Sequence, residues 1–170
     1  MSFRLRLTYG ILFGVLFFLG SLIIGMTEHK ILSTMSLIGT SITFEAQPAA
    51  VASLPLRFHP FSGAMISILA NLIPIPLLML ILNEIILHWG WLGRRLQKAE
   101  IWSRKYGKYG VWVLVPLSPI LGAYVSIGIG YVMRWNRSLA LCSVLLGMVA
   151  SSFIITYGGE SIVRIFHALL

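Results

Sequence analysis

Glu45 has the greatest potential for chemistry in this sequence, because it is a carboxylate inside a long apolar stretch, residues 31–56. An ionised side chain near the middle of a membrane costs on the order of 3 kcal/mol. Such a group is therefore protonated, paired, or open to a water-filled cavity. A carboxyl group in this setting can take up and release a proton, and we predict that Glu45 is a proton or cation site. The alternative is structural: Glu45 would cap a broken helix by accepting hydrogen bonds from backbone N–H groups.

Prolines and a glycine interrupt two apolar stretches and create further candidates. Pro48 lacks an N–H group and disfavours helical geometry at Gln47, which predicts a break beside Glu45. In the stretch 111–133, two prolines and a glycine within 116–122 predict a turn. Backbone groups freed at such breaks need partners, and a bound ligand or water can supply them. The predicted substrate-binding or ion-binding residues at the breaks, besides Glu45, are Gln47, Pro48, Ser118, Pro119 and Gly122.

Two more polar residues are candidates for the same site. Asn71 lies in the apolar stretch 61–87, where an amide needs hydrogen-bond partners and usually faces protein or a cavity. We predict that it lines a substrate path, although a contact between helices would explain it equally well. Arg57 follows the first interrupted stretch, where it could approach Glu45 or attract an anion.

The residue types that most enzymes need are missing. The chain has no Asp, a single cysteine, Cys142, and four histidines without a metal-ligand spacing. No arrangement of a nucleophile beside a base is visible either. We therefore predict that the protein is not an enzyme and that it binds neither a metal ion nor another cofactor.

The composition indicates a membrane as the solvent. Of the 170 residues, 58% are hydrophobic and 11% are charged, whereas a soluble domain carries about a quarter charged residues. The net charge of +8 would suggest nucleic acid in a soluble protein. In a membrane protein, basic residues in cytoplasmic loops explain it better, so we expect membrane lipids and no nucleic acid as partners.

Counting basic residues selects among topologies, because cytoplasmic loops carry an excess of Lys and Arg. If all five apolar stretches crossed the membrane, five of the 13 basic residues would lie outside. If 31–56 and 111–133 are re-entrant hairpins instead, only Lys30, Arg57 and Arg164 lie outside. The second arrangement is better, and its hairpins are the two segments with broken centres. The N-terminus and the basic loop 88–110 are then cytoplasmic, in what we expect to be a bacterial inner membrane.

The predicted fold is an all-α, polytopic integral membrane protein with one membrane domain over 1–170. Three transmembrane spans (9–27, 61–87 and 139–157) accompany the two re-entrant helical hairpins. Because each hairpin precedes a span and the hairpins enter from opposite sides, the plan is an inverted repeat, in which broken helices meet at a midplane site. Apolar residues at steps of three and four predict an amphipathic helix at 92–109 on the cytoplasmic surface, which anchors the protein to anionic lipid or recognises an anionic substrate headgroup.

The sequence resembles the small multi-drug export protein family, a group related to DedA-type membrane proteins. That family has a motif Glu-Leu-Arg-Gly-Ala-Ile-Pro-Leu and, after about twenty residues, Gly-Asn-Leu-(Ile/Leu)-Pro-Val-Pro. Here Glu45-Ala46-Gln47-Pro48 begins the first motif and Ala70-Asn71-Leu72-Ile73-Pro74-Ile75-Pro76 matches the second. The family's later Lys-Tyr-Gly and Pro-Leu-Pro-Gly-Thr-Gly-Ala-Trp are similar to Lys108-Tyr109-Gly110 and the segment 116–124.

The chain departs from these motifs at two places. Gln47 stands where the family has Arg, and Pro119-Ile120-Leu121-Gly122 replaces Pro-Gly-Thr-Gly. These departures leave open whether the ligand differs or the activity is lost. The resemblance implies a membrane transport role with two re-entrant hairpins.

Three functions remain open from the sequence. The first is a small transporter or exporter, coupled to protons through Glu45, with a midplane site formed by both hairpins. A DedA-like lipid-carrier flippase is a variant of it, and a non-transporting membrane assembly or interaction protein is the alternative from another class. The substrate is not indicated. Because a chain this small often needs a second copy to enclose a path, we expect a homodimer.

Overall fold

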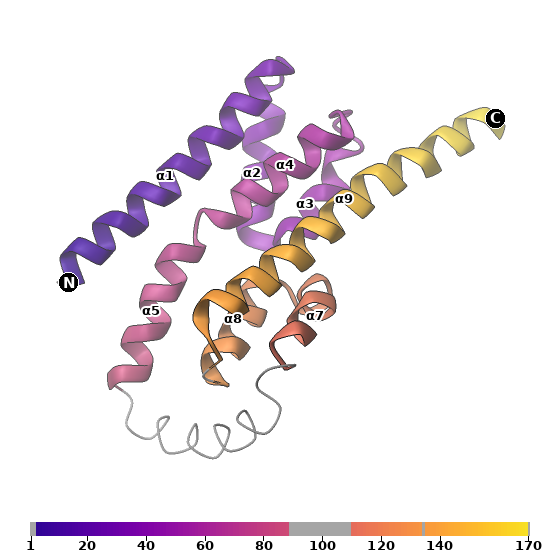
Figure 1. Ribbon diagram of the computed structural model, residues 1–170. Coiled ribbons are helices and arrows are strands. Elements are labelled where there is room, and N and C mark those ends of the chain that lie inside the picture. Colours follow the sequence, from indigo (N-terminus) through magenta and orange to yellow (C-terminus); the bar gives the residue numbers. More distant parts are fainter. Residues whose placement is uncertain (1–2, 89–109, 134, 170) are drawn as a thin grey trace. The chain divides into compact units, whose positions relative to one another are not determined.

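The computed structural model describes residues 3–88, 110–133 and 135–169, and within these ranges every regular element is a helix (Figure 1). The elements are α1 (Phe3–Thr27), α2 (Ile31–Phe44), α3 (Ala46–Ser53), α4 (Pro60–Leu72), α5 (Ile75–His88), a 3₁₀ turn η1 (Val111–Val113), α7 (Leu114–Leu121), α8 (Ala123–Val132) and α9 (Arg137–Leu169). The all-α fold class is therefore confirmed for the described residues. The predicted amphipathic helix at 92–109 lies outside them.

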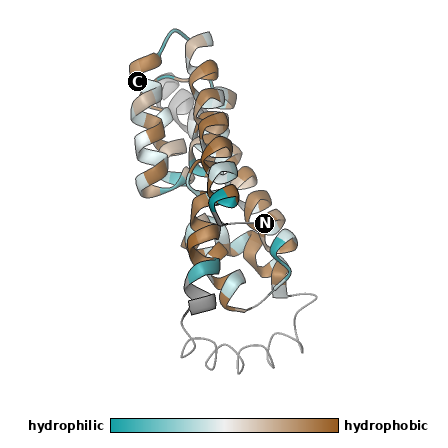
Figure 2. Cartoon of the chain, turned by 90° about the vertical axis from the view of Figure 1, so that its left-hand side faces the viewer, coloured by the Kyte–Doolittle hydropathy of each residue, from teal (hydrophilic) through white to brown (hydrophobic). Residues whose placement is uncertain are grey.

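Three apolar segments of the described chain are long enough to cross a membrane: Arg4–Thr27, Pro60–Glu84 and Arg137–Gly159. They cover the spans predicted at 9–27 and 139–157 in full and the one predicted at 61–87 up to Glu84. Large apolar side chains are exposed along them, among them Leu16 in α1 at 61% and Ile154 in α9 at 71%, and hydrophobic residues dominate the helices in Figure 2. An apolar surface of this extent is unfavourable in water but compatible with the lipid of a bilayer. The chain is a membrane protein.

The second span is not one continuous helix, because it turns at Ile73 and Pro74 between α4 and α5. Pro74 has no N–H group with which to bond the carbonyl of Ala70, and the N–H of Ile73 bonds that carbonyl instead, at 3.2 Å. Pro76 removes a second helical donor two residues later. The span predicted at 61–87 thus consists of two helices in series, α4 and α5.

Each of the two interrupted stretches is a pair of short helices linked by one residue. In 31–56 the pair is α2 and α3, linked by Glu45, and in 111–133 it is α7 and α8, linked by Gly122. The helices of each pair pack against each other. None of the four is long enough to cross a membrane; even α2, with 14 residues, is about 21 Å long against roughly 30 Å of hydrocarbon.

The chain divides into two compact units, whose boundaries fall within α1, within α9 and at the Pro74 turn. The α2–α4 unit comprises Leu12–Pro74 and Val149–Leu170, and the α5–α8 unit comprises Met1–Ile11 and Ile75–Met148. In the α2–α4 unit, both α2 and α3 pack against α4. Its core contains the buried residues Leu37, Ile38, Phe58, Ile66 and Ala70. In the α5–α8 unit, α8 packs against α5 as well as α7.

Candidate functional site

Glu45 links α2 to α3 in a backbone conformation that is normally reserved for glycine. Its φ is 76° and its ψ is 178°, in a region that costs a residue with a Cβ of order 1–3 kcal/mol. The side chain is half-buried and makes no capping hydrogen bond to α3. A side-chain cap to the following helix, α3, is therefore not the role of Glu45.

The break lies at Glu45, where Pro48 led us to expect one, but Gln47 does not take part in it. Gln47 is helical, and Pro48 is the third residue of α3. In the first turn of a helix the N–H groups have no partner within the helix, so a proline there removes nothing. Pro48 therefore allows a helix to start immediately after Glu45, instead of distorting the backbone at Gln47.

Gln47 contacts a residue that the sequence analysis missed. Its side-chain nitrogen donates a hydrogen bond of 3.2 Å to the hydroxyl of Ser151 in α9, and both residues belong to the α2–α4 unit. Ser151 is 8% exposed. A serine in an apolar helix is not by itself a signal, and only the fold brings this hydroxyl to the break.

Asn71 lies at the same level of the α2–α4 unit as Glu45. The hydroxyl of Ser41 in α2 donates a 2.7 Å hydrogen bond to the backbone carbonyl of Ser67 in α4. Glu45 and Asn71 each follow these residues by four positions, which is about one helical turn. Asn71 is fully buried, so its amide faces protein and not lipid. Glu45, Gln47, Pro48 and Asn71, four of the predicted site residues, thus belong to one unit.

The other three predicted site residues, Ser118, Pro119 and Gly122, belong to the α5–α8 unit. Gly122 alone makes the break, with φ 90° and ψ 160°. The turn predicted across 116–122 is wrong in its extent, because α7 continues through both prolines to Leu121.

Ser118 explains how α7 tolerates an internal proline. Pro119 has no N–H group for the carbonyl of Val115, four residues earlier. The hydroxyl of Ser118 lies 3.3 Å from that oxygen and 3.4 Å from the carbonyl of Val144 in α9, and it donates to both. Ser118 is fully buried. The hydroxyl that was expected to bind a ligand is thus engaged with the backbone in this structure.

Gly147 allows α9 to approach α7 at this point. A methyl group at Gly147 would overlap the carbonyl oxygen of Val115 and the hydroxyl of Ser118. Nothing in the sequence indicates this role, because several glycines are spread through the apolar segments.

Arg57 lies away from Glu45. It follows α3, whereas Glu45 precedes it, and eight helical residues separate their backbones by about 12 Å. The Arg57 carbonyl instead accepts a short hydrogen bond from the amine of Lys30, which also pairs with Glu28 at 3.4 Å. The carboxylate of Glu28 in turn accepts the backbone N–H of His59, at 3.2 Å. These polar contacts connect the segments that follow α1 and α3 and precede α4.

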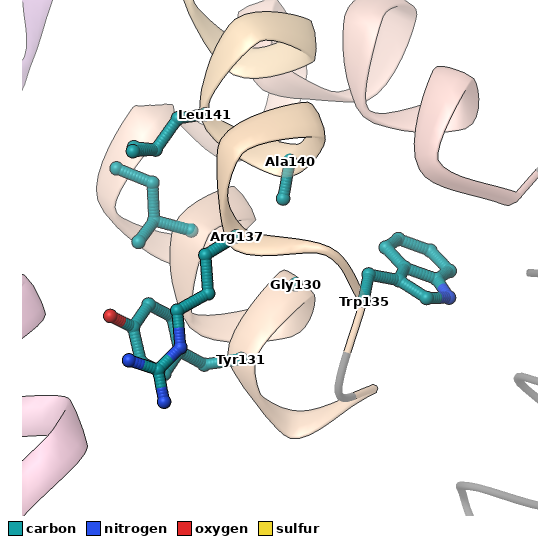
Figure 3. A pocket seen from close by; sticks show the side chains of 7 residues that line it. Gly130, Tyr131, Trp135, Arg137, Ala140 and Leu141 are labelled. Atoms are coloured by element: carbon teal, nitrogen blue, oxygen red, sulfur yellow. The ribbon is translucent and has the colours of Figure 1, made fainter.

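A small notch in the α5–α8 unit is lined by Ile127, Gly130, Tyr131, Trp135, Arg137, Ala140 and Leu141. The guanidinium of Arg137 lies across the ring of Tyr131, 5.3 Å from its centroid, while Trp135 points away from that pair (Figure 3). Arg137 also donates a 3.0 Å hydrogen bond to the side chain of Asn83. The free volume of about 10 Å³ suits a single water and not an organic substrate.

Comparison with known families decides the identity of the chain. The model of the family described as "Putative small multi-drug export protein" matches residues 45–154, most of the sequence. The chain belongs to this family. No curated protein and no solved structure matches it.

The family match spans both helix breaks. It begins at Glu45 itself and ends within α9, so it includes Asn71, Ser118, Gly122 and Ser151. The resemblance found in the motifs around Glu45 and Asn71 is thus confirmed. In the part of the chain that the structure describes, no group of three His, Cys, Asp or Glu side chains could hold a metal ion.

Proposed function

We propose that this small multi-drug export family member is a membrane transporter in which Glu45 is the proton or cation site. The observation that carries the proposal is a half-buried carboxylate at a helix break, in a backbone conformation that favours glycine. Strain of this kind persists only where the surrounding structure enforces it, and it is concentrated at functional sites. The side chain makes no cap to α3, so capping of this helix is not what we assign to the acid.

We assign three further polar residues to the substrate path beside Glu45: Gln47, Asn71 and Ser151. Two of them, Gln47 and Ser151, are hydrogen-bonded to each other, and Asn71 lies one turn beyond the Ser41–Ser67 bond that sets the level of Glu45. Amide and hydroxyl groups can exchange such bonds for bonds to a ligand at little net cost in free energy.

The short helices support a re-entrant arrangement. Helices α2, α3, α7 and α8 are apolar but too short to cross the bilayer, so each pair suits a hairpin that enters and leaves on one side. With three spans, this arrangement also gives the better distribution of basic residues. That the two hairpins are inverted and form a common site at the midplane remains a prediction.

The test is transport by the purified protein in proteoliposomes. With a pH gradient imposed and ethidium as a fluorescent organic cation, we expect Glu45→Gln to abolish uptake, because the amide cannot exchange a proton. Glu84→Gln, a carboxylate change in α5, is the matched control and should retain uptake. Normal melting of both variants must show that they are folded.

Unchanged proton-driven uptake by folded Glu45→Gln would remove Glu45 from the mechanism. A fluorescent phospholipid in the same vesicles reports on the flippase variant. Lipid movement that depends on Glu45, with no ethidium uptake by the unmodified protein, would replace the proposed transport of a soluble substrate.

A further inference from the structure

The two helix breaks have nearly the same backbone geometry and lie 77 residues apart. Glu45 has φ 76° and ψ 178°, and Gly122 has φ 90° and ψ 160°. The same shift of 77 relates Pro60 and Arg137, the first residues of α4 and α9, which are the second helices after the two breaks. It also relates Ser41 to Ser118, each four residues before its break.

The hydrogen bonds made by these two serines correspond as well. Ser41 donates to the carbonyl of Ser67 and Ser118 to that of Val144, and in both cases donor and acceptor are 26 residues apart. Bonds between successive turns occur in every helix, but a bond over this separation depends on how three helices are folded together.

The loops before α4 and α9 extend the correspondence. His59 and Asn136 occupy equivalent positions, and each accepts a hydrogen bond at its side chain from the N–H group two residues later, at 3.3 and 3.1 Å. Backbone hydrogen bonds match in the same way. The N–H of Phe58 donates to the carbonyl of Ser53 (3.2 Å), as that of Trp135 does to Gly130 (3.1 Å). The N–H of Gly63 donates to the carbonyl of His59 (2.9 Å), as that of Ala140 does to Asn136 (2.9 Å). Different side chains at the equivalent positions make the same bonds.

We propose that 34–71 and 111–148 are two copies of one helical unit, and that Glu45 occupies the position that this unit builds for glycine. The second copy has glycine there, at Gly122, and avoids the strain. In the first copy the acid is retained against the preference of the backbone. The role of the acid at this position rests on the proposed function. The inference that the two units are copies does not depend on that function.

The copies differ in the polar residues that the first copy carries at and near its break. At the equivalent positions the first copy has Glu45, Gln47 and Asn71, and the second has Gly122, Tyr124 and Met148. The ionisable group at the breaks is therefore present in one copy only, and the second copy supplies the backbone shape without the charge.

Glycine and alanine substitutions at the two breaks test this inference by thermal unfolding in detergent. Both Glu45→Gly and Glu45→Ala remove the carboxylate, but only glycine relieves the positive φ. We expect the Tm of Glu45→Gly to exceed that of Glu45→Ala by a few degrees. Gly122→Ala should lower the Tm by a similar amount. Ser41→Ala and Ser118→Ala should each lower it, whereas Ser36→Ala, at an exposed position in α2, should not.

A Tm of Glu45→Gly at or below that of Glu45→Ala, or an unchanged Tm of Gly122→Ala, would overturn the proposal. Ethidium uptake separates this inference from the proposed function. A stabilised Glu45→Gly that still transports would refute the role of the carboxylate and leave the duplicated unit standing. A Glu45→Gly variant that neither gains stability nor transports would refute the duplicated unit and leave the role of the carboxylate standing.

Discussion

The hydroxyl of Ser118 and the missing side chain of Gly147 act on the same carbonyl, that of Val115. Pro119 leaves this oxygen without its helical donor, and Ser118 supplies a replacement at 3.3 Å. Gly147 provides the space in which that hydrogen bond forms. At the scale of single residues, a hydroxyl and a missing side chain thus allow α7 and α9 to pack closely around one carbonyl.

Gly147→Ala tests this close approach. The added methyl group would overlap both Val115 and Ser118, and we expect a loss of about 1–3 kcal/mol in the free energy of unfolding. Gly128→Ala in α8 is the control, because a methyl group there would meet nothing within 4 Å. Chemical or thermal unfolding measures both, and equal stability of the two variants would contradict the described packing of α7 against α9.

At the scale of elements, a break in a helix depends on which backbone groups it leaves unpaired. Helix α7 continues through Pro119 because Ser118 satisfies the freed carbonyl, and it ends at Gly122. At the end of α4 the N–H of Ile73 bonds the carbonyl of Ala70, and the helix ends where Pro74 and Pro76 remove two donors close together. A proline alone therefore does not locate a break.

A double-mutant cycle between Ser118 and Pro119 measures this compensation. With Pro119 present, Ser118→Ala removes a donor from the Val115 carbonyl and should cost about 1 kcal/mol of unfolding free energy. In a Pro119→Ala background the new N–H group can bond that carbonyl, so the same serine change should cost less. Equal effects in both backgrounds would show that the two residues act independently.

The sequence allowed the spans and the existence of both breaks to be predicted, but not the residues that make them. Long apolar segments and clustered prolines are local signals, and they were sufficient for the helices around 9–27 and 139–157. The break beside Glu45 was predicted, but the helical conformation of Gln47 was not, because the tolerance of Pro48 depends on where α3 begins. Ser41 and Ser151 were missed because each gains its role from a partner far along the chain. For Ser41, its spacing from Glu45, equal to that of Ser118 from Gly122, was the signal that could have revealed it.

At the scale of the whole molecule, the predicted topology can be tested by cysteine labelling. In a background where Cys142 is replaced by alanine, single cysteines at the positions of 45–48 and 116–122 that are not buried, such as Pro48 and Pro116, should react with a membrane-impermeant maleimide. Inverted re-entrant hairpins predict that the two groups are reached from opposite sides of the membrane. A cysteine at Leu16, which is exposed on α1, should face lipid and remain unlabelled. Labelling of both groups from the same side would exclude the inversion.

The presence of an acid in only one of the two matched breaks has a consequence for energetics. If Glu45 is the proton or cation site that we propose, it is the sole ionisable group at these two positions, and one chain would carry a single unit of charge through them in each turnover. Exchange of one proton for one monovalent organic cation then moves no net charge across the bilayer. Such a cycle is driven by the pH difference between the two compartments and does not depend on the membrane potential.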